Sequence, residues 1–505
     1  MNNSNIELKV TDSVTFVSGK MDKDLYQEFK RTLGYFDSTA IWKKRGKNWD
    51  GYISTVCFNK SYCKCPIKKD GIHFPTGLYS RAVDFFKAYG RTVSTIDNRS
   101  SYQVGQLNIT KSSALQTRDY QEDIIEKACK QQRGIIKAAT GSGKTAIGSG
   151  IIAKLGVAPF IFYVTSQDLL VQAKSELERF LLNSGQPMKV GVIGGSKCEI
   201  RDINIMTVQT AVRSLGEKYE KFDDEESDEE DDISIKENRY AVISDLVRSA
   251  KGIIADECHH WSAKTCQIIS DYSINARFKF GLSGTPWRDE GDDMLIDACF
   301  GKLIAEINAS FLIRKGILVQ PQIYFVHNSL QMEKNIPYQT AYKQGIVENE
   351  KRNGIIANIA QKMKDNGRNT LILVKHIEHG STLEQMIPGA VFLKGKDSSK
   401  TRQAHIEQMR QKKIPITIAT SIFDEGVDVK PLDGLILAGS GKSQTRALQR
   451  IGRVIRTYED PISGFVKKDA YIVDFQDNFI YMNNHSNRRR NIYRTEPEFI
   501  IREFK

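Results

Sequence analysis

Short runs of Ile, Val and Phe recur along most of the chain and alternate with longer segments of helical character. Between about residues 116 and 307, strands of this kind are predicted at Gly134–Ala138, Pro159–Thr165, Ile203–Thr207, Gly252–Ala255 and Phe278–Leu282. Strands that alternate with helices are typical of a parallel sheet wrapped by helices. This region is therefore predicted to be an α/β domain.

The same alternation restarts further along and predicts a second α/β domain. Its strands are expected at Asn369–Lys375, Ala390–Leu393, Ile416–Ala419, Gly434–Ala438 and Ala470–Val473. The join between the two domains is expected near Gln320–Pro337.

The first part of the chain has a different pattern, with strand-like alternation and helical stretches in one short segment. Strands are predicted at Ile6–Val10 and Ser13–Val17, and helices at residues 24–33 and 78–89. A polar run at 97–101 marks the end of this small α+β domain. We therefore expect three domains, at residues 1–105, 106–320 and 321–505.

Charge changes this picture, because the chain carries 73 Lys and Arg against 61 Asp and Glu, a net charge of +12. A surplus of this kind suits a polyanionic partner. Residues 1–110 hold 17 of the basic and 10 of the acidic residues, a local net charge of +7. Residues 223–232 are almost purely acidic and are expected to form a solvated loop, because like charges at this density repel.

Other sequence features argue against a membrane protein or an exported one. No run of about 18 apolar residues occurs, and the N-terminus has neither a basic nor an apolar export region. The eight cysteines are scattered, which favours a reducing cytoplasm.

The segment from Ala138 to Thr145 has the pattern of a phosphate-binding loop, placed between a predicted strand and an apolar segment. Its glycines let backbone N–H groups approach phosphate oxygens, and the next helix directs its positive dipole end at the anion. Lys144 can reach the β- and γ-phosphates, and the Thr145 hydroxyl can bind Mg²⁺. The alternative is a glycine-rich turn with a chance Lys-Thr pair. The expected ATP contacts are Ala139, Thr140, Gly141, Ser142, Gly143, Lys144 and Thr145.

Two carboxylates follow the predicted strand at 252–255. Asp256 is placed to position Mg²⁺, and Glu257 is placed to orient and deprotonate the attacking water. Cys258, His259 and His260 could instead be metal ligands, but this single cluster has no partner set at zinc spacing. Coupling to the rest of a motor is the preferred role for His259.

Arg453 and Arg456 are three residues apart and are expected to share one face of a helix. Because apolar residues give this segment a second, buried face, we interpret the pair as an arginine finger that reaches a γ-phosphate across a domain cleft. A solvated basic helix face is the alternative.

These segments, in this order, resemble the superfamily 2 helicases of the DExH kind, and among them the recombination helicases of phages. The resemblance implies two tandem RecA-like parallel-sheet domains preceded by a small α+β DNA-binding domain. It implies ATP and Mg²⁺ as cofactors, with further nucleotide contacts at Arg118, Gln121, Gly426 and Asp428. Coupling between hydrolysis and movement is implied for His259, Ser283, Thr285 and Gln449.

Contacts to nucleic acid are expected in two places. The resemblance implies strand contacts at Gln167, Gly195, Thr207 and Thr420. In the first domain, cations between two tryptophans suit phosphates while an indole could stack on a base; alternatively, both tryptophans belong to the core. The residues concerned are Lys43, Lys44, Arg45, Lys47 and Trp49.

The roles of two further groups of residues stay open. Cys57, Cys63 and Cys65, with His73 nearby, could bind zinc, but their spacing matches no standard zinc finger. The arginines at 488–490, with Arg494, either extend the DNA contacts or form a solvated tail.

The sequence thus predicts a monomeric, ATP-dependent DNA helicase or translocase, located in the cytoplasm (that of a host cell if phage-encoded). The resemblance further implies branched or forked DNA as the partner, with junction migration, fork regression and unwinding of RNA–DNA hybrids in recombination, repair and replication. The alternatives are a DNA-translocating subunit of a restriction system, an RNA helicase, or an ATP-switched clamp that does not separate strands.

Overall fold

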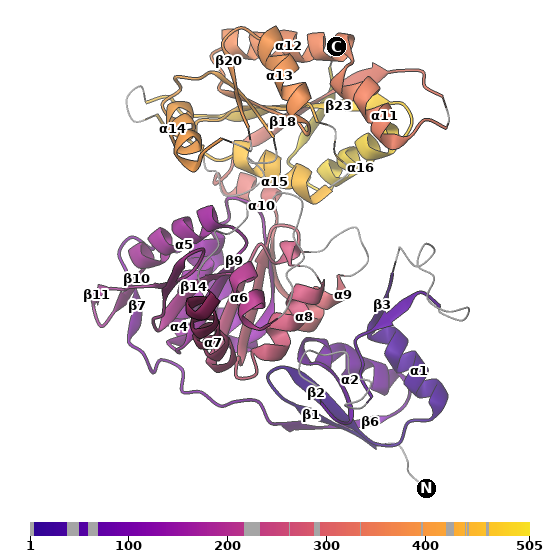
Figure 1. Cartoon of the computed structure of the whole chain (residues 1–505), viewed down its shortest axis with the longest axis vertical. Helices are drawn as coiled ribbons and strands as arrows, with labels where there is room; N and C mark the ends of the chain where they lie inside the picture. Colours follow the sequence, from indigo (N-terminus) through magenta and orange to yellow (C-terminus); the bar gives the residue numbers. More distant parts are fainter. Residues whose placement is uncertain are drawn as a thin grey trace. The chain divides into compact units, whose positions relative to one another are not determined.

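The computed structural model of the chain describes residues 5–37, 50–58, 69–216, 233–261, 263–286, 293–333, 335–394, 397–420, 429–439, 441, 444–460 and 464–504. It forms two compact units, Met1–Ala138 with Gly143–Glu306, and Ala139–Ser142 with Ile307–Lys505. Each unit contains one large sheet with parallel strands at its centre (Figure 1).

The first unit begins with a small four-stranded sheet of order β5-β2-β1-β6. In β1 every second side chain is buried, as expected for a strand with one face toward a core. Helices α1 and α2 supply the other half of this core (Figure 1). The elements are β1 Asn5–Val10, β2 Val14–Ser18, α1 Lys23–Thr32, β3 Gly34–Phe36, β4 Tyr52–Ser54, β5 Ile72–Pro75, α2 Tyr79–Ala88 and β6 Thr92–Asp97.

This small domain packs closely against the rest of the first unit. Its hydrophobic core includes Ala298 of α9 (Met294–Phe300). A Cβ atom on Gly77 would lie 2.1 Å from the carbonyl oxygen of Asp297, so only glycine fits there. The Arg133 guanidinium donates to the carbonyl of Asp12. Removal of the small domain would therefore expose apolar surface on α9.

The large sheet of the first unit has the order β13-β12-β14-β9-β15-β16-β8-β17, and its six strands from β12 to β8 run parallel. Its strands are β8 Arg133–Ala138, β9 Phe160–Val164, β12 Gly191–Gly194, β13 Lys197–Glu199, β14 Ile203–Thr207, β15 Gly252–Asp256, β16 Phe278–Ser283 and β17 Leu303–Ile307. Its helices are α3 Asp119–Gln131, α4 Lys144–Leu155, α5 Gln167–Phe180, α6 Val208–Ser214, α7 Ile233–Ser249 and α8 Ala263–Tyr272. A small side sheet pairs β7 Ile109–Lys111, β10 Leu181–Asn183 and β11 Gln186–Pro187.

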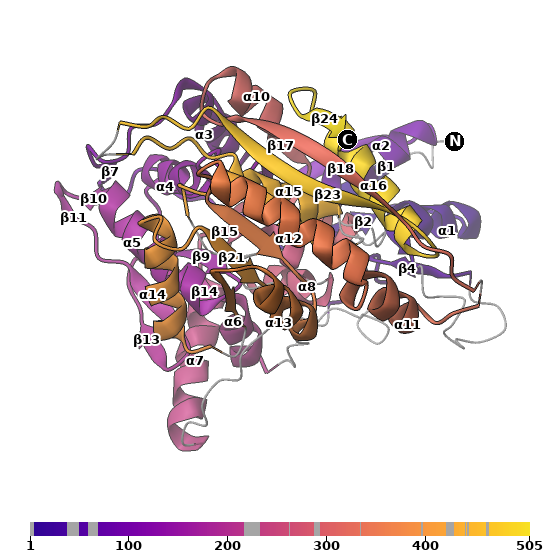
Figure 2. The ribbon, with the colours of Figure 1, turned by 90° about the horizontal axis from the view of Figure 1, so that it is seen from above.

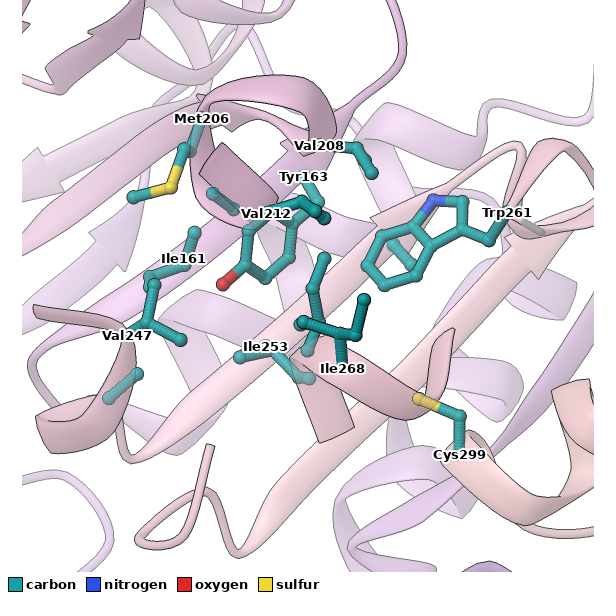
Figure 3. Packing of buried hydrophobic residues seen from close by; sticks show 14 of the residues in the cluster. Ile161, Tyr163, Met206, Val208, Val212, Val247, Ile253, Trp261, Ile268 and Cys299 are labelled. Atoms are coloured by element: carbon teal, nitrogen blue, oxygen red, sulfur yellow. The ribbon is translucent and has the colours of Figure 1, made fainter. Parts of the chain in front are cut away.

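Mostly aliphatic side chains fill the core between this sheet and helices α6, α7 and α8, with a few aromatic rings among them (Figure 3). Tyr163 of β9 meets Trp261 edge to face at a centroid distance of 5.4 Å. Trp261 also packs against Phe300 of α9. Because Trp261 directly follows the short 3-10 turn Cys258–His260, this packing anchors the turn that carries the Asp-Glu-Cys-His sequence.

The second unit holds a seven-stranded, fully parallel sheet of order β20-β21-β19-β22-β23-β18-β24. Helices α12 and α13 cover one face, and α15 and α16 lie on the other (Figures 1 and 2). The strands are β18 Gln320–Ser329, β19 Thr370–Leu373, β20 Ala390–Leu393, β21 Ile416–Ala419, β22 Gly434–Leu437, β23 Asp469–Asn478 and β24 Ile500–Glu503. The helices are α10 Ala309–Arg314, α11 Tyr338–Tyr342, α12 Glu350–Asp365, α13 Ile377–Met386, α14 Ser399–Arg410, α15 Gln444–Val454 and α16 Met482–Arg494.

The predicted fold class, two tandem parallel-sheet domains after a small α+β domain, is confirmed. Each strand predicted from the apolar runs is present, with ends that differ by a few residues at most. The acidic run at 223–232 lies outside the described residues. Within the described part of the chain, no helix is long and apolar enough to cross a membrane. The exact division into three domains stays a prediction.

Candidate functional site

The parallel strands of the first unit bring their carboxyl ends to one edge of the sheet. The predicted phosphate-binding loop follows β8, the Asp-Glu pair ends β15, and Ser283 ends β16. Because β15, β16 and β8 are neighbours in the sheet, these three segments lie side by side. Edges of this kind are where open α/β sheets bind ligands.

The loop after β8 has the backbone that phosphate binding needs. Gly141 and Gly143 take φ angles of +90° and +83°, which residues with a Cβ rarely adopt. Gly143 caps α4, whose first residue is Lys144. A Cβ on Gly143 would lie 2.5 Å from Nε2 of Gln121, so Gln121 is packed against the loop. The sequence requirement for glycine therefore has a local steric cause at both positions.

Lys144 and the two carboxylates form one cluster at the sheet edge. The Lys144 ammonium donates to Oε1 of Glu257, and both side chains are largely buried. Burial raises the pKa of Asp256 to about 7, the Lys144 charge opposes this rise, and the Glu257 charge adds to it. Glu257 takes a left-handed backbone conformation with φ of +45°, which is unusual for a residue with a side chain.

The second oxygen of Glu257 has no hydrogen-bond partner within the described structure. Oε2 is buried and lies 3.4 Å from Nδ1 of His259 without a hydrogen bond to it. A buried carboxylate oxygen without a partner costs free energy unless a ligand or a water molecule binds it. The Glu257 Oε2 atom can thus accept a hydrogen bond from a bound ligand or water, and the role of Glu257 as the base stays a prediction.

The residues present fit a nucleoside triphosphate with Mg²⁺. Among the described residues, no group of three or more His, Cys, Asp and Glu side chains could hold a metal ion by itself. Mg²⁺ in phosphate sites commonly binds one or two protein oxygens, with phosphates and water as its other ligands. Thr145 and Asp256, both half-buried, would supply these protein oxygens. When bound, the ion would supply positive charge against the phosphates.

A hydrogen bond joins the Asp-Glu segment to the end of β16. Nδ1 of His259 lies 2.7 Å from Oγ of Ser283, and both residues are buried. The same Ser283 oxygen accepts a hydrogen bond from the backbone N–H of Thr285 at 3.0 Å. The three residues expected to couple hydrolysis to movement in this unit therefore form one chain of contacts.

The predicted adenine contacts lie at the start of α3. The side-chain oxygen of Gln121 accepts a hydrogen bond from the backbone N–H of Arg118 at 2.8 Å, which caps the helix. Gln121 is buried beside the loop, whereas the Arg118 side chain reaches toward the Tyr120 hydroxyl at 3.4 Å. The role of Arg118 and Gln121 in reading the base stays a prediction.

Three predicted strand contacts lie at the same sheet edge, after β9, β12 and β14. Gly195 has a φ of +56°, and a Cβ on it would lie 3.3 Å from Nε2 of Gln167, so these two residues are adjacent. Thr207 is buried and caps α6. Arg239 of α7 donates to the carbonyls of Gly195 and Lys197 and holds this turn. Sequence reasoning missed Arg239, because no motif surrounds it and only the tertiary fold brings α7 to the turn.

In the second unit, α15 carries the predicted coupling residue Gln449 and one of the two predicted finger residues, Arg453. Gln449 is buried and Arg453 is half-buried on this helix. The expectation that Arg453 and Arg456 share a helical face is wrong, because α15 ends at Val454. Arg456 instead forms an antiparallel bridge with Leu318, and the chain is held there by a hydrogen bond from Val319 N–H to Ile455 O of 2.8 Å.

Several other predicted residues are placed differently or lie outside the described chain. Thr420 is buried directly after β21. Gly426, Asp428, Cys63, Cys65 and the segment 38–49 with its lysines and tryptophans lie outside the described residues. Arg489 is not available for DNA, because it is buried against Asp474 with two hydrogen bonds of 2.9 Å.

Comparison with known proteins agrees with this geometry. A protein-family model described as "Type III restriction enzyme, res subunit" matches residues 114–288, and one described as "Helicase conserved C-terminal domain" matches residues 332–458. The two matches together cover more than half of the chain. The chain belongs to the superfamily 2 helicases.

Two curated relatives illustrate where this helicase falls. The chain is 28% identical over 398 residues to putative helicase 22 of a Sulfolobus islandicus filamentous virus. This match covers 73% of the chain and 65% of the relative. The chain is also 28% identical over 216 residues to the ATP-dependent DNA helicase uvsW of Enterobacteria phage T4, covering 40% and 42%. The resemblance to phage recombination helicases is thereby confirmed, although the chain spans less than two thirds of either relative.

A solved structure shows the same tandem fold. It is the fragment of a putative HsdR subunit of a type I restriction enzyme from Vibrio vulnificus YJ016, 18% identical, covering 76% of this chain and 68% of that one, with a TM-score of 0.52. At this identity the likeness concerns the fold alone, two RecA-like domains in tandem.

Proposed function

We propose that this chain is an ATP-dependent DNA helicase or translocase. The observation that carries the proposal is the cluster of Lys144, Asp256 and Glu257 at one sheet edge, connected through His259 to Ser283. This arrangement joins a phosphate-binding cation, a half-buried carboxylate and a proton acceptor within one continuous set of contacts. Membership in the superfamily 2 helicases supports the same activity.

In this proposal each residue of the site has one task. Lys144 leaves the Glu257 carboxylate and binds the β- and γ-phosphates when the nucleotide enters. Glu257 then has both oxygens available, and it orients the attacking water and accepts its proton. Arg453 and Arg456 stabilise the charge that develops on the γ-phosphate, which lowers the barrier without tightening ATP binding.

The preferred substrate within this proposal is branched DNA, for junction migration, fork regression or the unwinding of RNA–DNA hybrids. The net charge of +7 in residues 1–110 supports a phosphate-binding role for the first domain. The relative uvsW is described as a DNA helicase, which favours DNA over RNA. A translocating restriction subunit is the second candidate, favoured by the HsdR fragment of the same fold.

The decisive experiment measures ATP hydrolysis with forked DNA, linear duplex, single-stranded DNA and RNA as stimulators, with Lys144→Ala as the inactive control. We expect stimulation by DNA, strongest with the fork, and none in the variant. Stimulation by RNA alone would replace the DNA proposal with the RNA helicase alternative. Near-normal turnover of Lys144→Ala would remove the loop from the site.

The role of the first domain is better tested by point variants than by deletion, because its core is shared with α9. We expect Lys43, Lys44, Arg45 and Lys47, all replaced by Ala, to flatten the salt dependence of DNA binding by about 3 in slope. Replacement of Lys87 and Arg91 in the same domain is the control. If the slope falls by the same amount per removed charge in both variants, the segment contributes only general electrostatic attraction to DNA.

A further inference from the structure

Three buried side chains from three different helices bind the described residues of the loop that follows β22, which are Ala438, Gly439 and Gly441. Two of the donors are guanidinium groups and one is a phenol, and all three donate to main-chain oxygens of the loop. Arg352 of α12 donates to Ala438 at 2.8 Å, Tyr342 of α11 to Gly439 at 2.6 Å, and Arg489 of α16 to Gly441 at 2.7 Å.

The two arginines reach the loop from opposite faces of the sheet. Arg352 pairs with Asp477 of β23 and stacks over Phe475 at 4.0 Å, on the face covered by α12. Arg489 pairs with Asp474 on the other face, covered by α16 (Figure 1). Since side chains alternate along a strand, β23 anchors one buried ion pair on each of its faces. The loop therefore accepts hydrogen bonds from arginines on both faces of the sheet.

The chemistry of these donors suits positioning rather than simple core filling. An aspartate accepts the Nε–H of each guanidinium, which leaves the Nη1 group to reach the loop. Asp474 raises the pKa of Arg489 above its usual range, although burial acts in the opposite direction. The arginine thus stays charged, and a charged donor makes a stronger hydrogen bond to a carbonyl than a neutral one.

The loop itself cannot fix its own path. Gly439 and Gly441 have no side chain to pack, and a Cβ on Gly439 would lie 2.8 Å from the backbone nitrogen of Lys375. Glycine lets the loop approach β19 closely but gives up conformational restraint. The three donors supply restraint, together with the hydrogen bond from the Gly439 N–H to the carbonyl of Leu373 at 2.9 Å.

We propose that Tyr342, Arg352 and Arg489 are positioning residues that fix the start of α15 and so aim Arg453. α15 begins three residues after Gly441 and carries Gln449 and Arg453. A shift of the loop would be passed along the rigid helix to these side chains. The catalytic part of this inference rests on the proposed function, whereas the positioning of α15 can be measured without it.

The test uses Tyr342→Phe, which keeps the buried ring and removes only the hydroxyl that binds Gly439. Hydrogen–deuterium exchange over residues 438–456 is expected to become about fivefold faster, the factor for one lost hydrogen bond. In the active protein, kcat for ATP is expected to fall about tenfold with KM unchanged, because misplacement affects the transition state.

Tyr102→Phe is the control, because its hydroxyl also donates to a main-chain oxygen, that of Asn275 at 2.8 Å, and not to the loop. It should leave exchange over 438–456 at the wild-type rate. Arg489→Lys keeps a positive charge beside Asp474, but the shorter donor cannot also reach the carbonyl of Gly441. Its exchange over 438–456 should therefore become faster, as in Tyr342→Phe.

The outcomes separate the two proposals. Wild-type exchange in Tyr342→Phe, or the same acceleration in Tyr102→Phe, would overturn the positioning role. If Tyr342→Phe exchanges faster but the wild-type protein hydrolyses no ATP, the positioning role is retained and the proposed function is rejected. Faster exchange with an unchanged kcat would show that the loop does not aim Arg453, and would overturn that part.

Discussion

The two parallel sheets place charged residues at similar positions but use them in opposite ways. In the first unit, Lys144 and Glu257 meet at the sheet edge, and one oxygen of Glu257 has no hydrogen-bond partner among the residues that the structure describes. In the second unit, Asp474 is buried and accepts from Arg489, from the Tyr493 hydroxyl and from the backbone of Phe475. An incompletely bonded charge is available for chemistry, and a fully bonded one holds structure.

This difference teaches what to look for when charges gather in a parallel sheet. A raised carboxyl pKa and a left-handed backbone at Asp256–Glu257 mark a place where stability is given up. Paired aspartates on both faces of β23 mark a place where stability is gained only if every partner is present. Substitutions in the two regions should therefore separate turnover from folding.

The largest effect is expected for Glu257→Gln. The amide keeps the shape of the side chain but cannot accept a proton, so kcat for ATP should fall about 10³-fold while ATP still binds. The melting temperature should fall less than in Asp474→Asn, because the amide oxygen can still accept a hydrogen bond from Lys144. Turnover with thermal unfolding measures both, and persistent hydrolysis would mean that another residue activates the water.

Asp474→Asn should have the largest effect on folding. It leaves the Arg489 guanidinium buried without its counter-charge, at a cost of about 3–5 kcal/mol in the free energy of unfolding. Urea denaturation followed by far-ultraviolet circular dichroism, compared with the wild-type protein, would measure this. A loss below about 1 kcal/mol would contradict the distinction between the two regions.

His259→Ala should separate hydrolysis from movement. The contact to Ser283 is lost, and we expect strand separation per ATP to fall about tenfold while hydrolysis changes far less. Ser283→Ala should behave in the same way, and the double variant should show no further loss. Equal losses in hydrolysis and unwinding would place His259 in the chemical step.

The smallest effect is expected for Glu503→Gln. Arg490, the neighbour of Arg489, pairs with Glu503 at 2.7 Å, but Glu503 is about half exposed. Surface pairs contribute less than about 1 kcal/mol, so the free energy of unfolding should barely change. A loss as large as that of Asp474→Asn would mean that pairing rather than burial decides the effect.

The sequence by itself determined the fold class and the strands of the first unit, and it predicted where the candidate nucleotide residues lie along those strands. Apolar runs predict buried strands because burial is local in sequence, and the loop at 138–145 works through its own backbone. The Asp256–Glu257 pair could be assigned because a strand end fixes where its next residues lie. These features depend on neighbours within a few residues.

Only the tertiary structure decided the remaining roles. In the sequence, Arg489 belongs to a basic run that could lie on the surface. In the structure it is buried, because Asp474 of β23, fifteen residues earlier, lies opposite it and accepts its hydrogen bonds. The end of α15 at Val454 depends on Leu318, far away in the chain, and not on any local helix breaker. Whether a charge is reactive or structural depends on which distant groups complete its hydrogen bonds, and no periodicity along the chain records that.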